Sequence, residues 1–252
     1  MANKITSVAQ MVNSYHVAEV IYNQRESGTE LISNTDFKFM EKWGIKTPDP
    51  RKKELYKKVV SALRGNIKLC VIAKICLEEM DSMRFDTFAS VSSNQNDNKN
   101  IRSIYSSMEF SALKNVDLNT HSLNVLEEVL DELSEKDVYG SGPAVIACIL
   151  HDFGKAKKVR ELATPDSVSE NSSKFRMHPE VSSIYVRDVL YEKVRKALLD
   201  AKEDPNIRKT IDGIAELVAN HHNSSKAWKK KVGLINVADS KARKRELAEL
   251  DE

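Results

Sequence analysis

The stretch AVIACILHDFGK, from Ala144 to Lys155, decides the fold. Seven apolar residues precede His151 and Asp152 without a polar break. Pro143 suits the first turn of a helix and Gly154 suits its end, so the run predicts a short helix. Because this helix is apolar on every side, we expect it to be buried in the protein.

A histidine and an aspartate at the end of a buried helix need an explanation. Either the helix end reaches solvent, or the carboxylate of Asp152 is itself buried. A buried carboxylate is costly unless it is paired or binds a metal. His151 and Asp152 alone do not decide between these alternatives, but the positions of the other histidines do.

Five of the six histidines follow Thr120, each beside a predicted helical segment. With two aspartates, their order along the chain is His121, His151, Asp152, His178, His221, His222 and Asp239. This order resembles the HD superfamily of metal-dependent phosphohydrolases. The resemblance covers roughly residues 112–247 and includes the apolar run before the His-Asp pair, the Gly-Lys after it, His178-Pro179 and Ala238-Asp239.

The resemblance implies a metal centre with mixed imidazole and carboxylate ligands. It assigns a first metal to His121, His151, Asp152 and Asp239, and a second to His178, His221 and His222. Such ligands suit iron, manganese or zinc, with magnesium or nickel as further options. We expect two ions bridged by Asp152, which would activate water for attack on a phosphoester. Lys155, one turn beyond Asp152, is expected to neutralise a phosphate oxygen.

The expected function is therefore a phosphohydrolase or phosphodiesterase that cleaves a nucleotide, another phosphorylated small molecule or a nucleic acid. Two alternatives stay open: a di-iron oxygenase with the same ligand order, and a non-catalytic nucleotide-binding regulatory module. No Gly-Tyr-Pro follows His221 and His222, which counts against hydrolysis of cyclic di-GMP. The likeness of the segment Ala219 to Arg243 to ribonuclease Y and to dinucleoside-polyphosphate hydrolases is loose.

Several of these residues also have a purely structural interpretation. His121 could be a polar residue near a helix start, and His178 could be a helix cap. Lys155 could pair with a helix C-terminus, and Asp239 could be a surface residue balanced by cations. The cations Lys229, Lys230, Lys231, Lys241, Arg243 and Lys244 are predicted to lie mostly on a solvated face. Their alternative role is to attract a phosphorylated substrate.

Composition indicates an ordinary globular protein. Of 252 residues, 41% are hydrophobic and 30% are charged, and the net charge of +2 is too small to indicate nucleic-acid binding by itself. No apolar run is long enough to cross a membrane, and the N-terminus lacks the apolar core of a signal peptide. The three cysteines fall in apolar helical patterns, which predicts reduced core residues in a cytoplasmic protein.

With eight glycines and little alternating pattern, the chain predicts an all-α fold, an HD-domain helical bundle with an additional N-terminal helical region. Residues 1–100 are expected to form that region, whose role is unknown, including helices from Val8 to Tyr22 and from Arg51 to Met80. Its end, VSSNQNDNKN, predicts a flexible linker. Residues 101–252 are expected to form the hydrolase domain, in which a long polar loop leads to His178.

Overall fold

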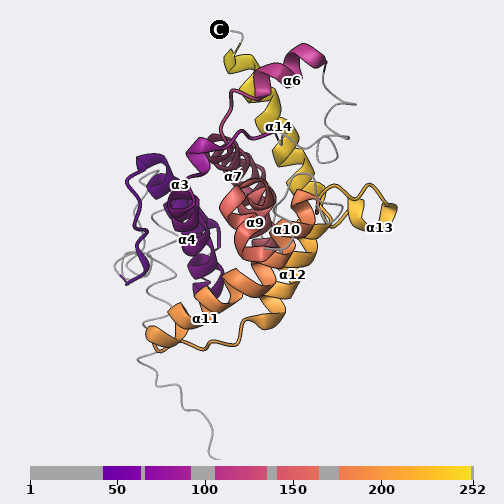
Figure 1. The fold of residues 1–252 in the computed structure, drawn as a ribbon. Coiled ribbons are helices and arrows are strands. Elements are labelled where there is room, and N and C mark those ends of the chain that lie inside the picture. Colours follow the sequence, from indigo (N-terminus) through magenta and orange to yellow (C-terminus); the bar gives the residue numbers. More distant parts are fainter. Residues whose placement is uncertain (1–41, 64–65, 92–105, 135–140, 165–175, 251–252) are drawn as a thin grey trace, which may run out of the picture. The chain divides into compact units, whose positions relative to one another are not determined.

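The computed structural model describes residues 42–63, 66–91, 106–134, 141–164 and 176–250 (Figure 1). The helix predicted from Val8 to Tyr22 lies outside these residues. In the described part, the only β-type pairing is one isolated bridge between Ala89 and Asp117, so the all-α prediction is confirmed. No helix in these ranges combines the length and apolarity needed to span a bilayer.

The described α-helices are α3 (Pro50–Ala62), α4 (Ile67–Ser82), α6 (Ser107–Leu113), α7 (Leu118–Ser134), α8 (Gly142–Leu150), α9 (Lys157–Ala163), α10 (His178–Ile184), α11 (Tyr191–Asp200), α12 (Arg208–Ala219), α13 (Lys226–Lys229) and α14 (Gly233–Leu250). Short 3-10 turns are η1 (Phe85–Thr87) and η2 (Phe153–Lys155). A π-helical segment, η4 (Tyr185–Leu190), joins α10 to α11.

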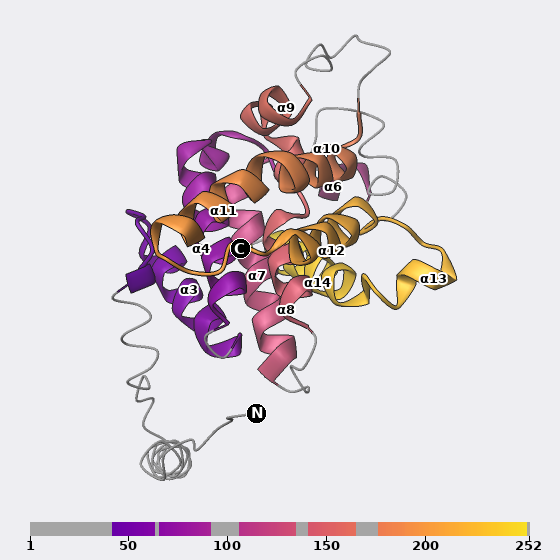
Figure 2. The same cartoon turned by 90° about the horizontal axis from the view of Figure 1, so that it is seen from below.

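Helix α8 is buried among these helices, as the sequence predicts. Its residues from Val145 to Leu150 are all buried, and α4, α7, α12 and α14 pack around it (Figure 2). Burying each of its large aliphatic side chains stabilises the fold by about 1.5–3 kcal/mol. The two residues that follow, His151 and Asp152, are 1% and 2% exposed, so the alternative of a helix end in solvent is wrong.

The single helix predicted from Arg51 to Met80 is wrong, because the chain forms α3 and α4 instead. Asn66 has an extended backbone, and its side chain accepts a hydrogen bond from the Leu69 amide at 3.2 Å. An asparagine in this role begins a new helix. The apolar spacing of α3 continues in α4, which is why the pattern looked like one helix.

Helices from both sides of residue 100 share one core. Helix α3 packs on α7, and α4 packs on α8 and α11. The compact unit runs from Trp43 to Glu252, so it begins well before the boundary that the sequence suggested. Most of the predicted linker falls in residues 92–105, outside the described part of the chain.

Candidate metal centre

The seven candidate ligands predicted from the sequence come from different helices and meet at one place. They are His121 in α7, His151 and Asp152 at the end of α8, His178 at the start of α10, His221 and His222 after α12, and Asp239 in α14. The helix-cap interpretation of His178 is wrong, since Met177 is the N-cap and His178 is buried in the first turn.

The ligands form two groups. In one, a nitrogen of His121, a nitrogen of His151 and a carboxylate oxygen of Asp239 all lie within 4.8 Å of one another. In the other, ring nitrogens of His178, His221 and His222 meet the same limit. Each group could hold a metal ion.

The carboxylate of Asp152 lies between the two groups. Its Oδ2 is 3.5 Å from Nε2 of His121 and 3.4 Å from Nε2 of His151. Its Oδ1 is 3.2 Å from Nε2 of His178. One oxygen therefore faces each group, which is the arrangement expected of a bridging carboxylate.

The distances between the candidate ligand atoms fit two donors that bind the same ion. Nε2 of His121 is 3.2 Å from Oδ1 of Asp239, and Nε2 of His222 is 3.2 Å from Nε2 of His178. Donor atoms that each lie about 2.1 Å from one ion are roughly 3.0–3.4 Å apart. Both pairs fall in that range.

Two imidazoles are oriented by carbonyl groups of their own helices. Nδ1 of His151 donates to the Cys148 carbonyl at 2.7 Å, and Nδ1 of His221 donates to the Val218 carbonyl at 2.7 Å. When such a ring is neutral, the proton on Nδ1 leaves a lone pair on Nε2. These two buried Nε2 atoms have no hydrogen-bond partner in the described ranges, a costly state that a metal ion would relieve.

A buried glutamate that sequence reasoning missed orients His121. Oε1 of Glu246 accepts from Nδ1 of His121 at 2.8 Å and from Nδ2 of Asn124 at 3.0 Å, and NH1 of Arg243 is 3.1 Å from Oε2. Burial alone would raise the pKa of Glu246, but His121 and Arg243 outweigh burial and lower it. Arg243, predicted to be solvated, is 3% exposed.

The carboxylates of the two candidate ligands Asp152 and Asp239 are held in their ionised form. Burial alone would raise the pKa of Asp152, but the charges of His151 and Lys155 keep it well below its usual range. For Asp239, too, burial is outweighed, first by the hydrogen bond and charge of His121, and its pKa is strongly lowered. The Asp239 side chain is 28% exposed, but Oδ1 is buried and directed at the centre, so this residue is no ordinary surface aspartate.

Two imidazoles of the second group are neutral at neutral pH. Burial, with a contribution from His178, lowers the pKa of His222 to about 4. Burial also holds the pKa of His221 well below its usual value, and His222 adds to the effect. The neutral imidazole is the form that binds metal.

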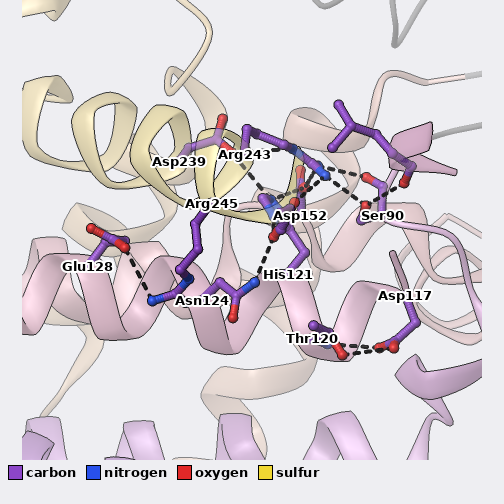
Figure 3. Close-up of polar contacts among 12 residues, drawn as sticks. Ser90, Asp117, Thr120, His121, Asn124, Glu128, Asp152, Asp239, Arg243 and Arg245 are labelled. Atoms are coloured by element: carbon purple, nitrogen blue, oxygen red, sulfur yellow. Dashed lines mark hydrogen bonds and ion pairs between the residues drawn. The ribbon is translucent and has the colours of Figure 1, made fainter. Parts of the chain in front are cut away.

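Lys155 lies directly against Asp152. Its Nζ donates to Oδ2 of Asp152 at 2.5 Å and to the Ser90 carbonyl at 2.7 Å, and its side chain is 3% exposed. Arg243 approaches the same place, donating to Oγ of Ser90 at 2.7 Å and to the Ser90 carbonyl at 3.1 Å (Figure 3). Two buried cations therefore flank Asp152, and the expected contact of Lys155 with a phosphate stays a prediction.

Gly154 joins the two halves of the centre. A Cβ atom there would lie 2.2 Å from the His178 carbonyl oxygen, so only glycine lets η2 approach α10 this closely. The Gly154 amide donates to Oγ of Ser182 at 2.7 Å, and that hydroxyl contacts the His151 carbonyl at 3.2 Å. The end of α8 and the start of α10 are thus held together.

The arrangement can hold two divalent ions close together, with imidazole and carboxylate donors that suit iron, manganese or zinc. The two ligand groups and the carboxylate between them are the features that such a dinuclear site requires. No protein-family model matches the chain, and neither a curated protein nor a solved structure matches it.

Proposed function

We propose that the chain is a metal-dependent phosphohydrolase with two divalent transition-metal ions. The observation that carries the proposal is the carboxylate of Asp152, which directs one oxygen to each ligand group. When bound, such a metal pair lowers the pKa of water toward about 7 and neutralises phosphoryl oxygens. The resemblance of the ligand order to the HD superfamily supports the same function.

The residues of the chain hold and orient the donor atoms. One ion would be held by His121, His151, Asp239 and Asp152, and the other by His178, His221, His222 and Asp152. Glu246 fixes the ring of His121 and supplies negative charge behind it. Lys155 acts as a positioning residue in this proposal, because its hydrogen bond orients Asp152 and keeps it ionised.

Charge favours a phosphorylated substrate. The three carboxylates of Asp152, Asp239 and Glu246 and the buried cations Lys155 and Arg243 together carry a single negative charge. Two divalent ions would leave the centre strongly positive. An anionic phosphoester and the hydroxide that attacks it would offset this charge, whereas an uncharged substrate would not.

The test is a screen of nucleotides, p-nitrophenyl phosphate and bis(p-nitrophenyl) phosphate with the chain loaded with manganese or iron. We expect hydrolysis that requires the metal, and we expect Asp152→Ala to lose metal and activity together. Metal-loaded protein that hydrolyses none of these phosphoesters would contradict the proposal. Oxygen consumption by the iron form in place of hydrolysis would indicate the di-iron oxygenase, and nucleotide binding without turnover would indicate the regulatory module.

A further inference from the structure

The segment from Asn223 to Lys231 is an exposed basic segment next to the candidate metal centre. It reads NSSKAWKKK and contains four lysines, one tryptophan and no acidic residue. Its helix, α13, has no buried residue. Figure 2 shows α13 standing away from the other helices, on the connection between α12 and α14.

Acidic side chains do not balance the charge of this basic segment, whereas they balance the charges of Lys241 and Arg245 on α14. On α14, Lys241 pairs with Glu132 at 2.9 Å, and Arg245 lies 3.3 Å from Glu127 and from Glu128. Within the described part of the chain, none of the four lysines between Asn223 and Val232 forms an ion pair with an acid. Their positive charge is therefore available to an anionic ligand.

Trp228 gives the basic segment an aromatic surface. Its side chain is half-buried, and Nζ of Lys231 lies 4.6 Å from the centre of one of its rings. Flat aromatic side chains set among cations are the elements that bind single-stranded nucleic acid, because a base stacks on the ring while lysines contact phosphates.

The basic segment is also close to the centre along the chain. Four residue steps separate His222 from Lys226, and so short a stretch spans at most about 14 Å. A strand of a few nucleotides bound on α13 could therefore reach the metal ligands. A membrane surface is disfavoured, because Ala227 and Trp228 are the only apolar residues that the basic segment offers for insertion.

We propose that the basic segment binds the phosphate backbone of single-stranded nucleic acid, with one base stacked on Trp228, and so presents a strand to the candidate centre. This inference rests on the proposed phosphohydrolase function, which it deepens by naming the substrate class. The small net charge of the whole chain gives no hint of it, because the acidic residues lie elsewhere.

The test measures binding of the full chain to a fluorescent, cleavage-resistant phosphorothioate 12-mer of thymidine by anisotropy over a range of salt concentrations. Four lysine–phosphate contacts give a slope of log K against log salt of about −2.8. Replacing three of them (Lys229→Gln, Lys230→Gln, Lys231→Gln) should reduce the slope to about −0.7 and weaken binding about 100-fold at 0.1 M salt. Trp228→Ala should cost about 10-fold, and Trp228→Phe should restore most of it.

The matched control removes the same charge from α3 (Lys53→Gln, Lys57→Gln, Lys58→Gln), where all three lysines are exposed, and should bind the oligonucleotide like the unchanged chain. The inference would be overturned if both triple variants lost oligonucleotide affinity equally, or if the unchanged chain did not bind the oligonucleotide. Binding only to phosphatidylserine vesicles would overturn it as well. Bis(p-nitrophenyl) phosphate separates it from the proposed function. If that ester is hydrolysed while the oligonucleotide does not bind, the inference alone fails; if the oligonucleotide binds while no phosphoester is cleaved, the proposed function fails.

Discussion

Replacing Gly154 by alanine should separate the two halves of the candidate metal centre. The new Cβ would lie 2.2 Å from the His178 carbonyl oxygen and 2.9 Å from both the Ser182 amide nitrogen and Cβ of Val181. Non-bonded carbon and oxygen atoms ordinarily stay about 3.3 Å apart. Because the closest atom belongs to the backbone, α10 as a whole must withdraw by about 1 Å.

The expected loss of stability has two parts. Overpacking of a well-packed interior costs about 1–3 kcal/mol. Withdrawal of α10 also breaks the 2.7 Å hydrogen bond between the Gly154 amide and Oγ of Ser182, and a buried group left unsatisfied costs about 1–3 kcal/mol. A total of about 4 kcal/mol lowers the melting temperature of a chain of this size by about 8–16 °C.

The assay combines thermal unfolding with elemental analysis of the purified variant. Since α10 carries His178, Gly154→Ala should lose metal from the group of His178, His221 and His222 before it loses metal from the other group. The control is Gly213→Ala in α12, where nothing lies within 4 Å of the added Cβ and where alanine should stabilise the helix by about 0.5–1 kcal/mol. If Gly154→Ala melts at the temperature of the unchanged chain and keeps its metal, the argument from close approach is refuted.

Three further predictions follow from the same contacts. Glu246→Gln should weaken metal binding about 10–100-fold in a chelator competition, because it removes the negative charge beside the imidazole of His121. The control Glu249→Gln, at an exposed position, should not weaken it, and equal metal affinities of the two variants would contradict the role of Glu246. A chain beginning at Trp43 should fold, but one beginning at Asn100 should aggregate, since it lacks α3 and α4; a soluble, metal-containing fragment from Asn100 would contradict the shared core. Lys155→Ala should weaken metal binding about 10–100-fold and slow phosphoester hydrolysis with it, because it removes the cation that orients Asp152 and keeps it ionised; unchanged metal affinity and full activity in steady-state assays would remove its assigned role.

The buried helix and the candidate ligands were accessible from the sequence. An apolar run that ends in His151 and Asp152 predicts a charged group in a buried place, which is costly without a partner. The order of the remaining histidines indicates that a metal centre could compensate this cost. The structure brings all seven candidate ligands together because His121 and Asp239 lie within helices that pack on α8, and the other five follow or begin α8, α10 or α12. Residue type and position were enough to predict that these side chains lie together.

The residues that support the ligands were harder to find. Arg243 and Glu246 belong to a highly charged helix that looks solvated, and only their spacing of four and seven residues from Asp239 places all three on one face. The contact of Lys155 with the Ser90 carbonyl joins residues 65 positions apart, so no local pattern contains it. The break at Asn66 was hidden because apolar residues recur at helical spacing on both sides of it.

The metal content of the purified full chain, measured by elemental analysis beside that of Asp152→Ala, tests the central claim most directly. Asp152 contacts both ligand groups, so its loss should release both ions. We expect about two transition-metal ions per chain in the unchanged protein and almost none in the variant. An unchanged protein that contains no metal, even after anaerobic reconstitution with iron or manganese, would contradict the metal centre and the function proposed for it.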